Sequence, residues 1–110
     1  MTRLGVVRLT GKSGTMYKFG AYPLDTVFKK GMGGVFVVTR RVRKNSGAVK
    51  HREIHLGQTG DLRLPVPDEG GSFVTAGANC ICFHGEKNET TRQQIQQDLT
   101  GRHQAADNAS

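Results

Sequence analysis

The sequence predicts a small α+β domain, in which an antiparallel β-sheet is followed by one helix near the C-terminus. Segments rich in β-branched and aromatic residues, joined in pairs by glycine-containing turns, predict β-hairpins. A later segment with apolar residues at helical spacing predicts the helix. At 110 residues the chain has the size of one domain. We assign residues 1–103 to this domain and residues 104–110 to a flexible polar tail.

The first hairpin is predicted from residues 3–9 and 16–22. Both segments contain β-branched or aromatic residues, and the second alternates Tyr17 and Phe19 with polar or small residues. Between them, Gly11-Lys12-Ser13-Gly14 has the composition of a tight turn. We therefore expect two short antiparallel strands at the start of the chain.

The segment from Val35 to Val42 is the most strand-like in the chain, because it is dense in Val and Phe. We expect it to be the central strand of the sheet. The turn residues Asn45-Ser46-Gly47 then lead back through a basic segment to Ile54–Leu62. This arrangement predicts a second, longer hairpin.

The tip of the second hairpin is strongly basic. Because side chains alternate along a strand, Arg41 and Arg43 point to one face of the hairpin, while Arg40 and Val42 point to the other. Six basic residues fall within thirteen positions that contain no acidic residue: Arg40, Arg41, Arg43, Lys44, Lys50 and Arg52.

Two interpretations of this basic hairpin compete. A basic β-ribbon can lie along a phosphate backbone and gain affinity by releasing counterions, which favours nucleic-acid binding by all six residues. Alternatively, the charges only keep the hairpin soluble and prevent edge-to-edge pairing. We favour nucleic acid. Few aromatic residues accompany the charges, so we do not expect base stacking.

The last strand is predicted over Asn79–His84. Alternation places Cys80, Cys82 and His84 on one face, where they offer zinc ligands, with His51 or His55 as a possible fourth. The favoured alternative is that the cysteines are small buried apolar residues, and we predict no metal site.

The C-terminal helix is predicted over Glu89–Leu99. Asn88 is suited to the N-cap, Ile95 and Leu99 form a narrow apolar stripe, and Gly101 marks the end.

Charge favours a polyanionic partner. The formal net charge is +7 and the isoelectric point is near 9.9, and the first 63 residues carry thirteen Lys or Arg against three acidic residues. No apolar run approaches the about 20 residues of a membrane-spanning helix, and Met1-Thr2-Arg3-Leu4 lacks the apolar segment of a signal peptide. We expect a cytoplasmic protein with no membrane partner.

Three segments resemble the GIY-YIG nuclease superfamily. Gly34-Val35-Phe36 and His55-Leu56-Gly57 are similar to the two halves of its signature, and Gly57-Gln58-Thr59-Gly60-Asp61-Leu62 is similar to the segment that follows. The chain also looks like small bacterial members that share a Gly-Lys-Ser-Gly start and a Gly-Ala-Asn-Cys-Ile-Cys strand. The resemblance covers residues 10–100 and implies the nuclease fold.

Carried over position by position, the resemblance places the family's catalytic roles on Phe36, His55, Arg63 and Gln96. Phe36 has no hydroxyl to exchange a proton, and the Gln96 amide is a poor ligand for Mg²⁺. Pro65 and Pro67, followed by Gly70-Gly71, are incompatible with the helix that carries the family's arginine. The resemblance therefore implies a catalytically degenerate member that does not cleave.

Three functions remain open from the sequence. The favoured function is a non-cleaving nucleic-acid-binding protein that uses the basic hairpin. The second is a protein-interaction or inhibitor module, with self-association as one form of it, in which the segment Pro65–Gly71 exposes apolar surface. The third is a weak Mg²⁺-dependent endonuclease with His55 as the base. We expect no cofactor, except Mg²⁺ if nuclease activity remains.

Overall fold

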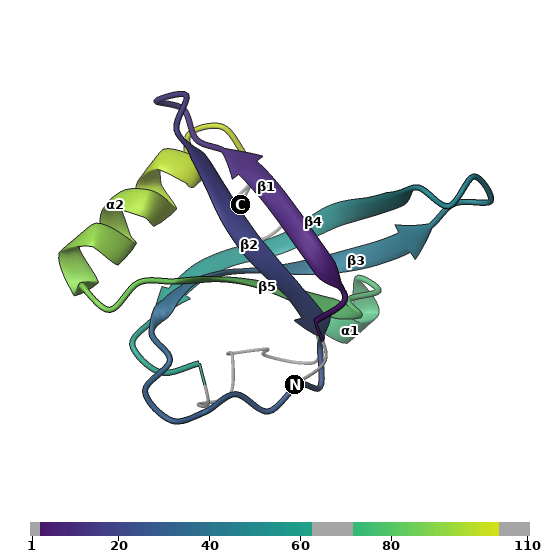
Figure 1. Cartoon of the computed structure of the whole chain (residues 1–110), viewed down its shortest axis with the longest axis horizontal. Coiled ribbons are helices and arrows are strands. Elements are labelled where there is room, and N and C mark those ends of the chain that lie inside the picture. The colour runs from purple at the N-terminus through teal and green to yellow at the C-terminus, as the bar shows by residue number, and fades with distance from the viewer. Residues whose placement is uncertain (1–2, 63–71, 104–110) are drawn as a thin grey trace.

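The chain folds as an antiparallel sheet with one long helix, as Figure 1 shows. The computed structural model describes residues 3–62 and 72–103. The five-stranded sheet has the order β1-β2-β5-β3-β4. This architecture confirms the predicted α+β class. The elements are β1 (Gly5–Thr10), β2 (Met16–Pro23), β3 (Gly34–Arg43), β4 (Val49–Thr59), α1 (Ser72–Thr75), β5 (Cys80–Gly85) and α2 (Glu89–Thr100).

The N-terminal hairpin forms where the sequence predicts it. Strands β1 and β2 pair from Gly5 opposite Ala21 to Thr10 opposite Met16. The connecting turn includes Gly14 at φ 88°, a left-handed conformation that glycine adopts without steric cost. Its backbone is closed by hydrogen bonds from Gly11 N to Thr15 O and from Gly14 N to Gly11 O.

Strand β3 lies inside the sheet, but the prediction that it is the central strand is wrong. It pairs with β4 on one side and with β5 on the other, and β5 occupies the middle position because it also pairs with β2. A Val-rich composition shows that a strand is buried on both faces, but it does not give the strand's position in the sheet.

The two faces of the sheet carry separate cores. Alternation along β3 sends Val35 and Val37 to one face and Phe36 and Val38 to the other. We call the first the α2 face, because α2 packs there through Ile95 and Leu99. The α2-face core contains Phe19, Ala21, Val35, Val37, Leu56, Cys80, Cys82, Ile95 and Leu99. The opposite core contains Phe28, Phe36, Val38, Ile54, Leu62, Phe73 and Ile81.

Helix α2 matches its predicted signals. The side chain of Asn88 caps it by accepting a hydrogen bond from Thr91 N at 2.9 Å. Ile95 and Leu99 are buried as the apolar stripe predicts, and Gly101 is the C-cap. The helix ends at Thr100, one residue beyond the predicted end.

Asp98 attaches helix α2 to the turn of the first hairpin. Its carboxylate accepts hydrogen bonds from Ser13 N (2.8 Å), Ser13 Oγ (2.7 Å) and the Tyr17 hydroxyl (2.7 Å). A side chain at Gly11 would place Cβ 2.1 Å from an Asp98 carboxylate oxygen, so glycine is required for this approach. The Gly11-Lys12-Ser13-Gly14 turn is thus a docking point for the helix.

The variant Asp98→Asn is expected to lower the midpoint of thermal unfolding at neutral pH. Hydrogen bonds from the Ser13 side chain, the Ser13 backbone and Tyr17 hold the pKa of Asp98 below its ordinary value. This stabilisation is present above the unfolded-state pKa and is lost as the pH falls through the lower folded-state pKa. Circular dichroism should show that the difference between wild type and variant shrinks in acid. An equal difference at both pH values would contradict this role.

Helix α1 is one short turn that the sequence did not predict. The predicted loop Pro65–Gly71, and Arg63 before it, lie outside the residues that the structure describes. Neither helix in residues 3–62 and 72–103 has the length and apolar composition needed to cross a bilayer.

Candidate functional site

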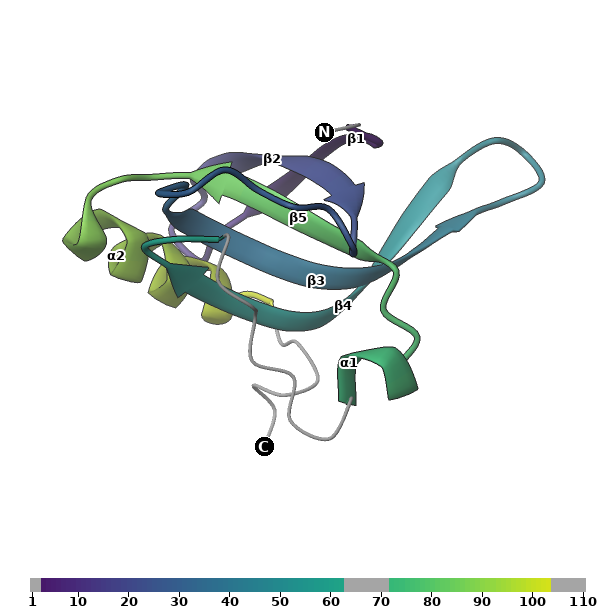
Figure 2. The same cartoon turned by 90° about the horizontal axis from the view of Figure 1, so that it is seen from below.

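The outer half of the β3–β4 hairpin extends away from the sheet (Figure 2). The register shifts between Val38, which pairs with His55, and Thr39, which pairs with Glu53. Ile54 is therefore the extra residue of a β-bulge, a feature that bends a strand and increases its twist. The bulge separates an inner half, which belongs to the sheet, from the outer half that contains the basic residues.

The hairpin is fixed at both ends. At the tip, Gly47 donates to Lys44 O at 2.9 Å and adopts φ 88°, as in hairpins whose turn ends in a left-handed glycine. At the base, the Asn79 side chain continues the pairing beyond β5. Its Oδ1 accepts from Arg41 N at 2.7 Å, and its Nδ2 donates to Arg41 O at 3.0 Å. The basic residues are therefore presented by an ordered two-stranded ribbon.

Four of the six predicted basic residues gather on one side of this ribbon. Arg40 lies directly opposite Arg52, and Val42 lies opposite Lys50. We call this surface the basic face; it borders a hollow of ≈ 300 Å³. The basic face consists of Arg40, Val42, Lys44, Lys50 and Arg52.

The cross-strand pair Arg40 and Arg52 is unusual, because like charges directly opposite each other destabilise a sheet. Both guanidinium groups are held by backbone carbonyls: Arg40 Nη1 donates to Gly77 O at 3.4 Å, and Arg52 Nη2 donates to Ala76 O. Gly77 allows this approach, since a Cβ there would lie 2.9 Å from Arg40 Nη1.

No carboxylate neutralises the basic face within the described part of the chain. The ion pair between described residues joins His103 and Glu53 and involves none of the four cations. Carbonyl oxygens orient the two arginines without cancelling their charge. The result is a cluster of positive charge that no carboxylate of residues 3–62 and 72–103 neutralises, in which the two arginines are held in place.

Arg41 and Arg43 lie on the other side of the ribbon, as alternation predicts. Arg41 pairs with His51 and Arg43 with Val49. The six predicted residues are therefore divided between two faces, with four on the basic face and two on the α2 side.

The resemblance assigns catalytic roles to Phe36, His55 and Gln96 among the described residues, and these three do not lie together in one site. Phe36 and His55 lie side by side with ring centroids 5.6 Å apart, and Phe73 packs on His55 at 5.1 Å. Burial lowers the pKa of His55. Gln96 belongs to α2, which packs on the other face of the sheet from Phe36. Arg63 is outside the described residues.

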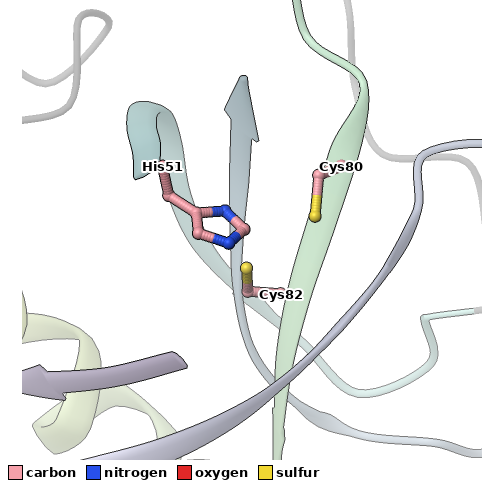
Figure 3. A group of neighbouring side chains, drawn as sticks. All are labelled: His51, Cys80 and Cys82. Atoms are coloured by element: carbon pink, nitrogen blue, oxygen red, sulfur yellow. The ribbon is translucent and has the colours of Figure 1, made fainter. Parts of the chain in front are cut away.

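A second group of polar side chains lies on the α2 face. The side chains of His51, Cys80 and Cys82 lie close together (Figure 3). Each places one ligand atom within 4.8 Å of the other two. Both cysteines are buried, and neither forms a disulfide bond. Thr39 Oγ1 lies 2.9 Å from His51 Nδ1. His51 and Cys82 also border a cavity of ≈ 320 Å³.

This group differs from the set of Cys80, Cys82 and His84 that the sequence offers as zinc ligands. His84 shares the face of the cysteines but hydrogen-bonds Lys18 O and packs on Tyr17 and Phe19. Same-face residues of a strand are about 6.6 Å apart, so three in succession extend about 13 Å, too far for one ion. His55, the other suggested ligand, lies on the opposite face of the sheet with Phe36.

The two thiols are not equivalent. A hydrogen bond from Cys82 lowers the pKa of Cys80 to about 7, against the effect of burial. The same bond and burial raise the pKa of Cys82. Burial and the nearby Arg41 charge lower the pKa of His51, which favours the neutral imidazole.

Fold and site together define a small basic α+β protein with a projecting, positively charged β-ribbon. Comparison of the chain with protein-family models, with curated proteins and with solved structures finds no match.

Proposed function

We propose that this protein binds nucleic acid through the basic face and does not cleave it. The observation that supports this proposal is the Arg40–Arg52 pair, in which two like charges lie opposite each other without a carboxylate partner among the described residues. A phosphate group placed between the two guanidinium groups would relieve their repulsion and accept charge-assisted hydrogen bonds.

The geometry of the ribbon suits a phosphate backbone. Lys44 and Lys50 extend the positive charge from the Arg40–Arg52 pair towards the hairpin tip, so successive phosphates can be contacted along one line. Backbone contacts of this kind give affinity without sequence preference. The target is therefore a nucleic-acid backbone rather than a base sequence.

We propose that the protein does not cleave nucleic acid because of the residues at the positions where the resembled family has its catalytic groups. The phenyl ring of Phe36 cannot exchange a proton, and His55 is packed between Phe36 and Phe73. Gln96 is on α2, across the sheet from this pair. Within the described residues, these groups do not surround a common phosphodiester.

Fluorescence anisotropy of a labelled DNA duplex, titrated at several salt concentrations with Mg²⁺ present, tests the proposal. If the four cations of the basic face each neutralise one phosphate, the logarithm of the binding constant should fall with the logarithm of salt with a slope of about −3.6. The DNA should run intact on a gel afterwards.

Two results would count against the proposal. Lack of binding at low salt would leave the charges with only a solubilising role. Cut DNA would show that a nuclease activity survives the substitutions at Phe36 and Gln96, and would favour the alternative in which His55 is the base.

A further inference from the structure

We propose that His51, Cys80 and Cys82 form a binding site for one Zn²⁺ ion. The site is on the α2 face of the sheet and is independent of the proposed nucleic-acid binding. Its three ligands come from β4 and β5, with β3 between these two strands. The structure therefore joins residues that are far apart in sequence.

The spacing of the ligand atoms is close to that of a zinc site. They lie within 4.8 Å of one another. With Zn–S bonds of about 2.3 Å and Zn–N bonds of about 2.0 Å, tetrahedral ligands lie about 3.5 to 3.8 Å apart. Side-chain rotations that bring the atoms about 1 Å closer are therefore enough, without a change in the strands.

Thr39 orients the histidine for this role. Its hydroxyl is hydrogen-bonded to His51 Nδ1 at 2.9 Å, so Nε2 is the ring nitrogen that would bind the metal ion. Metal-binding histidines are usually fixed in this way by a hydrogen bond to the second ring nitrogen. Thr39 is 2% exposed, pairs directly with Cys80 in the sheet and borders the same cavity as His51 and Cys82, so it lies beside all three proposed ligands.

The donor set selects the metal. Thiolate and imidazole ligands favour Zn²⁺ over Mg²⁺ or Ca²⁺, which take oxygen ligands. Two thiolates and a neutral imidazole balance the charge of the ion, and the protons of the thiols are released to solvent on binding. Two buried cysteines alone would be explained as small apolar residues, but this explanation does not account for His51 and Thr39 beside them.

Three protein ligands leave one coordination position open. Because His51 and Cys82 border the ≈ 320 Å³ cavity, an ion between them would have water or a small ligand on its cavity side. Glu53 also borders this cavity, and its carboxylate is paired with His103 at 3.1 Å.

Cobalt substitution tests the site directly. The reduced wild-type protein should bind one Co²⁺ per chain, with a thiolate-to-cobalt charge-transfer band that Zn²⁺ abolishes. Cys80→Ser and Cys82→Ser should each remove most of this band. His51→Gln should weaken binding by more than the about 10- to 100-fold typical of losing an outer-shell partner, and Thr39→Val by about that amount.

His84→Gln is the matched control. It removes a histidine from the same sheet face, but outside the proposed ligand set, and should leave cobalt affinity unchanged. Circular dichroism of each variant without metal separates lost binding from lost folding. If wild type shows no charge-transfer band while both thiols react with a thiol reagent, the proposal is wrong. The proposal also fails if folded His51→Gln binds cobalt as wild type does.

Discussion

Replacing Arg40 and Arg52 together with alanine is expected to weaken duplex DNA binding about 60-fold at roughly 0.1 M salt. By counterion release each lost phosphate contact costs about eightfold in affinity at this salt concentration. The salt slope should become shallower by about 1.8, since two phosphate contacts are removed. Anisotropy titrations of wild type and variant at several salt concentrations measure both quantities.

The double variant Arg41→Ala/Arg43→Ala is the matched control. It removes the same number of charges from the same hairpin, but from the side away from the basic face. It should lower DNA affinity only modestly, because it reduces the long-range electrostatic attraction between the positively charged protein and DNA. Equal losses in the two double variants would show that net charge, and not the basic face, determines binding.

The Arg40/Arg52 variant should remain folded. Both side chains are exposed, and their removal eliminates a repulsion between directly opposed charges. Loss of the hydrogen bonds to Gly77 O and Ala76 O opposes this gain. Urea denaturation should therefore give a free energy of unfolding within about 1 kcal/mol of wild type, so the change in DNA affinity can be interpreted directly.

Arg92→Ala is expected to lower the free energy of unfolding by about 2 to 4 kcal/mol, a large part of the stability of a small domain. Arg92 is 8% exposed although it is charged. Its Nε donates to Gln58 Oε1 at 3.0 Å, and Nη1 donates to Glu86 O at 3.3 Å and Lys87 O at 2.8 Å. Truncation leaves these acceptors without a donor and opens a space at the start of α2.

Arg102→Ala provides the comparison for Arg92→Ala. Arg102 is exposed just beyond the same helix, and its removal should change the free energy of unfolding by less than about 0.5 kcal/mol. Urea denaturation followed by circular dichroism measures both variants. Similar small losses in the two variants would contradict a structural role for Arg92.

Local sequence patterns predicted most of the fold. Turn glycines at Gly11 and Gly14, the Asn88 cap and the Ile95/Leu99 stripe are short-range signals, and each predicted element is present. The order of strands depends on contacts between distant segments, so the central position of β5 did not follow from composition. The burial of Arg92 was missed for the same reason, because its acceptors come from β4 and from the turn after β5.

The candidate sites were predicted only in part, because of the bulge at Ile54. His51 and His55 are four residues apart and would share a face in a regular strand. The extra residue reverses the alternation, so His51 joins Cys80 and Cys82 while His55 packs on Phe36. The same reversal brings Lys50 and Arg52 to the side of Arg40. No residue type in the segment identifies a bulge from sequence.

The most direct test of the basic face is a nuclear magnetic resonance titration of ¹⁵N-labelled protein with a DNA duplex. We expect the largest chemical-shift changes in residues 40–52 and in the Nε resonances of Arg40 and Arg52, with smaller changes at Arg41 and Arg43. A different hollow of ≈ 420 Å³ lies beside Met32 and Phe83. Largest changes around that hollow, or none in residues 40–52, would contradict the proposal that the basic face binds nucleic acid.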